Sequence, residues 1–129
     1  MSARSTNSSA TLTDEQSAAR ELVRSWAAGS RAVEAARDVE QGDPHAWRPA
    51  YDGLAQLGTF GVALPEEHGG ADGTVADLCA MLDEAAAAMV PGPVASTAVA
   101  TLVLSDSHAE LLEALASGEG AAGVPGGVL

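Results

Sequence analysis

The segment Leu57–Gly70, which reads LGTFGVALPEEHGG, constrains the fold of this chain more than any other part of the sequence. Gly58 follows an apolar residue and suits the position just after a helix, where a positive φ is favoured. Phe60, Val62 and Leu64 alternate with small residues, and this period predicts a short buried extended run. The sequence therefore predicts a helix end followed by one short extended segment.

The second half of this segment predicts a turn. Pro65 fixes its own φ, Glu66–His68 are expected to be solvated, and Gly69 and Gly70 permit a reversal that bulkier residues resist. The two carboxylates and the imidazole are also possible metal ligands. Adjacent residues rarely converge their ligand atoms, however, and no partner His or Cys lies at metal spacing, so we expect a solvated turn and no metal site.

Composition favours an all-α fold in a chain of 129 residues, which is long enough for one domain. Apolar residues make up 47% of the chain but aromatic residues only 3%. Alanine, valine and leucine must therefore fill the core, which suits closely approaching helices. The only cysteine, Cys79, excludes an internal disulfide and is expected to be a small buried apolar residue on its helix.

The charge balance limits the partners that this chain can have. The net charge of −12 disfavours binding to nucleic acid or to an anionic membrane. It also works against a phosphate site for coenzyme A on this domain alone. The first ten residues are polar and serine-rich, unlike a signal peptide, and no apolar run approaches the roughly 20 residues needed to span a bilayer. We therefore expect a cytoplasmic protein.

About six helices are predicted from apolar periodicity and from end signals. Capping boxes are expected at Thr13 with Gln16 and at Ser107 with Glu110, and Thr74 is expected to cap a further helix. The predicted helices run from Thr13 to Gly29, Ser30–Glu40, Pro49–Leu57, Val75–Met89, Val94–Leu104 and Ser107–Ala116. The sequence thus predicts a helical bundle with one extended segment.

The order of these elements resembles the N-terminal helical domain of the acyl-CoA dehydrogenases. Pro65–Gly70, reading PEEHGG, is similar to the Pro-Glu-Glu-x-Gly-Gly segment of that family. Trp47 ahead of a helix end, Pro91–Pro93 (PGP) and Leu111–Glu119 (LLEALASGE) extend the resemblance. It implies a tail at residues 1–12, the helical domain at 13–119, and the start of a β domain at 120–129.

The resemblance implies FAD-dependent α,β-dehydrogenation of an acyl-CoA thioester. In the family, the catalytic base lies in the C-terminal domain, and FAD is held mainly by the middle β domain and the C-terminal domain. No residue of this chain inherits either role, so the chain alone is expected to bind no FAD and to be inactive. The helix 94–104 corresponds to one wall of the acyl pocket. This correspondence places Ser96, Thr97, Ala100 and Thr101 nearest the acyl chain, unless they serve only helix packing.

Two alternatives remain open at this point. The chain could be a non-catalytic helical partner subunit of a split dehydrogenase. It could also be an acyl or peptidyl carrier domain that attaches phosphopantetheine at Ser107, since Asp106-Ser107-His108 faintly resembles the Asp-Ser-Leu turn of carriers. The helix faces that would contact the missing domains are open in the isolated chain, which predicts self-association.

Overall fold

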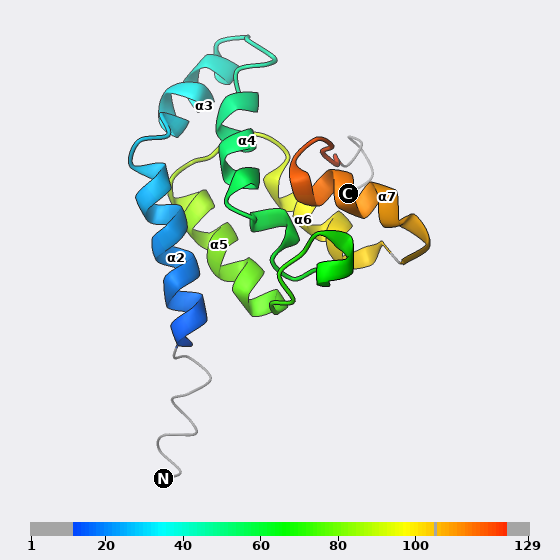
Figure 1. Ribbon diagram of the computed structural model, residues 1–129. Coiled ribbons are helices and arrows are strands. Elements are labelled where there is room, and N and C mark those ends of the chain that lie inside the picture. The colour runs from blue at the N-terminus through cyan, green and yellow to red at the C-terminus, as the bar shows by residue number, and fades with distance from the viewer. Residues whose placement is uncertain (1–11, 105, 124–129) are drawn as a thin grey trace.

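The computed structural model describes residues 12–104 and 106–123. The predicted tail at 1–12 therefore lies outside the described residues except for its last position. The predicted start of a β domain at 120–129 lies outside them from residue 124 onward. The described part contains helices and no strand, in agreement with the expected all-α class. Its helices are α2 (Asp14–Ala27), α3 (Ala32–Glu40), α4 (Arg48–Gln56), α5 (Val75–Ala87), α6 (Val94–Val103) and α7 (Ala109–Ser117) (Figure 1).

The predicted extended run after α4 is wrong. Its place is taken by a single 3₁₀ turn, η1 (Thr59–Gly61), which is followed by further turns and a second 3₁₀ turn, η2 (Glu66–His68). Gly58 (φ 88°) and Gly69 (φ 82°) both adopt the left-handed conformation. The backbone of residues 61–64 pairs with residues 71–73 inside one compact loop, so its polar groups are satisfied without a sheet.

Local capping sets two of the helix starts. Thr13 Oγ1 accepts from the Gln16 amide at 3.1 Å, and the Gln16 side chain returns a bond to the Thr13 amide. Thr74 and Asp77 form the same reciprocal pair at α5. The capping box predicted at Ser107 is wrong. A 3₁₀ turn, η3 (Asp106–His108), occupies that place, and His108 precedes α7 without a side-chain cap.

The main core lies where α2, α4 and α5 meet around η1. Figure 1 shows α2 and α5 side by side, with α4 between them and the α6–α7 end of the molecule. Tyr51 and Phe60 stack at a centroid distance of 5.0 Å in the middle of this core. The buried cluster consists of Val23, Tyr51, Leu54, Ala55, Phe60, Leu78, Met81, Ala85 and Ala98. A separate, smaller cluster of Leu64, Leu112 and Ala116 joins α7 to the loop after η1.

The buried face of α5 is rotated from the predicted one. Leu78 and Ala85 are buried as expected, together with Ala80 and Met81. Cys79, which was expected to be buried, is exposed, and Val75, Ala86 and Met89 on the predicted face are exposed as well. In an alanine-rich helix, apolar periodicity fixes the buried face poorly, and here packing against α2 and the core decides it. None of the helices in the described part is long and apolar enough to cross a membrane.

Candidate functional site

Two of the four predicted acyl-wall residues bind the segment that follows α7. Thr97 Oγ1 accepts from the Ala122 amide at 3.0 Å, and the Ser96 hydroxyl donates to the Ala122 carbonyl. Thr97 is fully buried, and Tyr51 Oη lies 3.0 Å from its hydroxyl. Burial raises the pKa of Tyr51, although the Thr97 hydrogen bond partly offsets this, so the phenol keeps its proton at neutral pH. Ser96 and Thr97 thus fix the path of the chain after α7.

The other two predicted residues lie one turn further along α6. Thr101 is buried, and its hydroxyl donates to the Ala98 carbonyl in the same helix at 2.7 Å. Ala100 is half-buried. The structure therefore brings Ser96 and Thr97 together around one backbone segment. Of the other two residues, Ala100 has a more accessible side chain than Thr101.

The outward face of α6 is apolar and accessible. Val99, Leu102 and Val103 are 57%, 43% and 73% exposed. Exposed neighbouring apolar side chains are typical of a surface that packs against another domain or chain.

Arg48 is a positioning residue that sequence reasoning missed. Its guanidinium donates to the Gly118 carbonyl at 2.6 Å and pairs with Asp52 at 2.9 Å. It also lies 5.4 Å from the Trp47 ring centroid and 5.6 Å from that of Tyr51, within cation–π range. Arg48 therefore ties α4 to the end of α7. No local sequence pattern predicts the contact with Gly118, because Arg48 and Gly118 lie 70 residues apart in the sequence.

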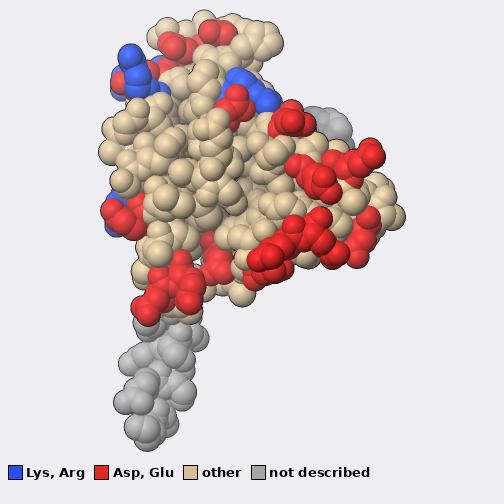
Figure 2. Space-filling view, in the orientation of Figure 1, with Lys and Arg blue, Asp and Glu red and all other residues tan. Residues whose placement is uncertain are grey.

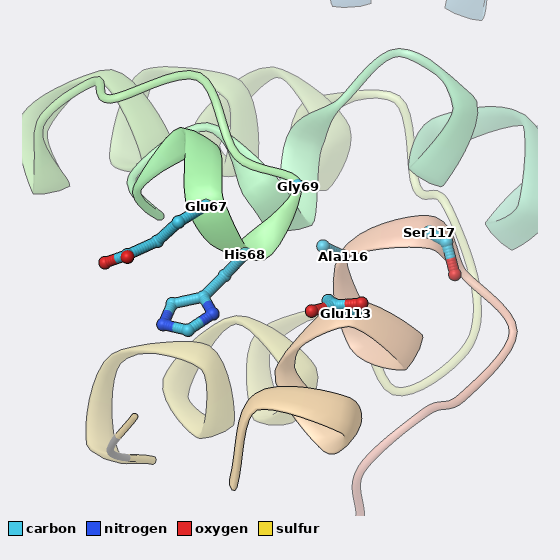
Figure 3. Close-up of a pocket in the computed structure, with 6 residues that line it drawn as sticks. All are labelled: Glu67, His68, Gly69, Glu113, Ala116 and Ser117. Atoms are coloured by element: carbon cyan, nitrogen blue, oxygen red, sulfur yellow. The ribbon is translucent and has the colours of Figure 1, made fainter. Parts of the chain in front are cut away.

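The PEEHGG turn forms a second candidate site around a buried histidine. His68, which was expected to be solvated, is only 7% exposed, and its Nε2 lies 2.9 Å from Asp106 Oδ1. Glu67 and Asp106 are exposed beside it. A shallow pocket of about 330 Å³ adjoins the ring and is lined by Glu67, His68, Gly69, Glu113, Ala116 and Ser117 (Figure 3). Sequence reasoning missed Asp106 because it lies 38 residues from His68.

The described residues show no dinucleotide-binding motif, and two of their arginines are already paired. No strand followed by a glycine-rich turn occurs in the described ranges. Arg20 and Arg24 are engaged by Asp83 and Glu84 across α2 and α5. Hydrogen bonds from Arg24 and Arg20 lower the pKa of Glu84, and the same contacts raise the pKa of both guanidinium groups. On the face shown in Figure 2, acidic side chains form several patches and basic side chains only small ones.

The chain was compared with known proteins. Residues 13–119 match the family model of the acyl-CoA dehydrogenase N-terminal domain. The chain is 63% identical over 123 residues to the acyl-CoA dehydrogenase FadE34 of Mycobacterium tuberculosis, a match that covers 89% of this chain and 17% of FadE34. It is 38% identical over 112 residues to the acyl-CoA dehydrogenase IpdE2 of Mycolicibacterium smegmatis, which covers 83% of this chain and 35% of IpdE2.

IpdE2 of Mycobacterium tuberculosis is 36% identical over 112 residues, a match that covers 81% of this chain and 34% of the relative. The chain thus spans about a sixth to a third of the length of these curated relatives. No solved structure matches it. With a family match that covers most of its length, this chain belongs to the acyl-CoA dehydrogenase family, to whose N-terminal domain it corresponds.

Proposed function

We propose that this chain is the N-terminal portion of a cytoplasmic FAD-dependent acyl-CoA dehydrogenase that removes hydrogens from the α and β carbons of an acyl-CoA thioester, as in fatty acid metabolism. The observation that carries the proposal is the family match over residues 13–119, strengthened by 63% identity to FadE34. When bound to such an enzyme, FAD supplies the hydride acceptor. The residues of this chain supply one helical wall of the acyl pocket and fix the path of the backbone that follows α7.

In this proposal the two pairs on α6 have different roles. Ser96 and Thr97 bind Ala122 and thereby direct the chain as it leaves the helical domain. Ala100 faces the acyl group, because its small, half-buried side chain leaves volume open. Thr101 packs beneath it, since its hydroxyl is already satisfied within α6. This assignment gives the direct contact with the acyl group to Ala100, and the other three residues support it.

We further propose that the 129 residues alone bind no FAD and turn over no acyl-CoA. The engaged arginines support this proposal, as does the open apolar face of α6, which also favours self-association. The test is to purify the chain, record its flavin absorbance, and assay acyl-CoA oxidation with a dye acceptor. Sedimentation gives its oligomeric state. A yellow, active preparation would contradict the proposal, and a strictly monomeric chain would contradict the self-association.

A chimera tests the enzyme function directly. This chain would replace the matching segment of FadE34, and the product would be assayed for flavin content and acyl-CoA dehydrogenation. We expect a flavin-loaded, active chimera. A folded, flavin-loaded chimera without activity would indicate that this chain is a different kind of helical module.

The same chimera tests the acyl wall. Ala100→Leu should raise KM for long acyl-CoA substrates several-fold, because the added side chain fills pocket volume. Ala95→Leu is the matched control, since Ala95 is exposed on the same helix. Equal effects of the two substitutions would remove Ala100 from the wall.

A further inference from the structure

We propose that Glu67, His68 and Asp106 form a binding site for a divalent transition-metal ion, with Zn²⁺ as the ion that best suits them. One ligand atom from each residue lies within 4.8 Å of the other two. A neutral imidazole and two carboxylates form a nitrogen–oxygen donor set of the kind that Zn²⁺ takes, with water as the usual fourth ligand. This inference is independent of the acyl-CoA function.

The histidine is held in a position to bind. His68 is 7% exposed, and its Nε2 is aimed at Asp106 Oδ1, 2.9 Å away. A carboxylate at neutral pH only accepts, so this contact assigns the proton to Nε2. When a metal ion binds, the imidazole would carry its proton on Nδ1 instead, so that the Nε2 lone pair and the carboxylate oxygen, which already face each other, can both bind the ion.

The second ring nitrogen of His68 bears on how the ring can bind a metal ion. His68 Nδ1 is buried and has no hydrogen-bond partner. Nδ1 can therefore take the ring proton when a metal ion occupies Nε2. In Figure 3 the ring lies between Glu67 and Glu113, at the wall of the pocket. With a metal ion on Nε2, the Nδ1 proton would need an acceptor, and the pocket beside the ring, which Glu113 also lines, leaves room for the ring to adjust toward one.

The charge around the site favours a cation over an anion. Glu67, Asp106 and Glu113 all border the ring or its pocket, and no arginine lines that pocket. The histidine distinguishes the metal, because Mg²⁺ and Ca²⁺ prefer oxygen ligands only, whereas Zn²⁺ accepts imidazole readily. A bound ion would connect η2 to η3 across 38 residues of sequence and would stabilise the folded state by mass action.

The test uses the full 129-residue chain after treatment with a chelator. Zn²⁺ is titrated by calorimetry, and Co²⁺ serves as a spectroscopic substitute whose visible absorption reports a bound nitrogen ligand. We expect one equivalent of Zn²⁺ to bind and to raise the melting temperature. His68→Gln keeps an amide donor toward Asp106 but lacks an imidazole, so it should weaken Zn²⁺ binding at least tenfold, and Asp106→Asn should do the same.

The matched control is His45→Gln, because His45 is an exposed histidine in the turn after α3. This variant should bind Zn²⁺ like the unchanged chain. The proposal is overturned if the unchanged chain binds no Zn²⁺ at a concentration of about 100 μM, because the dissociation constants of protein zinc sites lie far below this value. It is also overturned if His68→Gln binds as tightly as the control. The Co²⁺ spectrum of the unchanged chain decides the matter even if a variant fails to fold.

Discussion

The two ends of this domain are held together by different means. The end built from α2, α4 and α5 has a continuous apolar core and a side-chain cap at the start of both α2 and α5. The end built from α6 and α7 has a core cluster of three buried residues and depends on polar contacts between distant segments. Ser96 and Thr97 bind Ala122, Arg48 binds Gly118, and His68 binds Asp106. The first end is therefore stabilised mainly by burial, and the second by a few specific hydrogen bonds.

The largest loss of stability should come from truncating a side chain in the main core. Leu54 is completely buried there, so Leu54→Ala should lower the free energy of unfolding by about 3–4 kcal/mol through lost burial and a residual cavity. Leu112→Ala, in the small cluster, should cost only about 2 kcal/mol because the sparser packing can relax. Urea denaturation of both variants measures the difference. An equal or larger cost for Leu112→Ala would show that the second end is not held less by burial than the first.

The PEEHGG turn, which joins the two ends, should be nearly as sensitive. A Cβ at Gly70 would lie 2.1 Å from the Leu64 carbonyl oxygen and 2.6 Å from that of Gly61. Both oxygens accept loop hydrogen bonds, so Gly70→Ala must displace backbone and should cost about 2–3 kcal/mol. Gly29→Ala is the control, because its Cβ meets nothing within 4 Å, and it should be neutral or slightly stabilising. Thermal unfolding of the two variants provides the measurement.

Removing a helix cap at the first end should have a smaller effect on stability, and a conservative substitution provides its control. Thr74→Ala removes the acceptor for the Asp77 amide and should cost about 1 kcal/mol. Thr74→Ser keeps the hydroxyl and should change the free energy of unfolding little. Chemical denaturation distinguishes the two. If the serine variant were as unstable as the alanine variant, the capping explanation for the start of α5 would fail.

The smallest effect concerns the ion pairs between α2 and α5. Hydrogen bonds from Arg24 and Arg20 lower the pKa of Glu84 below its ordinary value, so the folded state binds its proton less readily than the unfolded state. The resulting stability is present above the ordinary pKa and is lost as the pH falls through the lowered one. The melting temperature of Glu84→Gln should therefore lie below that of the unchanged chain at pH 6, and the difference should shrink below about pH 4.

Glu21→Gln is the comparison for this last test, because Glu21 forms only a 3.4 Å pair with Arg24 on the exposed surface of α2. It should show little pH-dependent difference. If the difference in melting temperature between Glu84→Gln and the unchanged chain stayed constant down to pH 3, the charge of the Glu84 carboxylate would be excluded as its cause.

Most of the architecture could be predicted because the signals were local. The six helices of the described part, the caps at Thr13 and Thr74, and the left-handed glycine Gly58 depend on residues within a few positions of each other. The predicted extended run failed for a reason that is not local. The alternation of Phe60, Val62 and Leu64 fits a strand, but no neighbouring strand exists in the described part to pair with it, and the glycines close a compact loop instead.

The candidate sites could be predicted only in part. The sequence placed Ser96, Thr97, Ala100 and Thr101 on one helix but could not show that Ala122 returns to the first two. It named Glu66, Glu67 and His68 as possible ligands and rejected them, because adjacent residues rarely converge their ligand atoms and no partner His or Cys lies at metal spacing. Asp106 reaches Glu67 and His68 only through the fold.

The sequence by itself determined the family and the positions of the helices, because a motif such as PEEHGG and a capping threonine act over three or four residues. The tertiary structure alone decided which face of α5 is buried, that Cys79 is exposed, and that His68 is buried against Asp106. These outcomes depend on contacts between residues that are tens of positions apart, and only the packing of the helices brings such residues together.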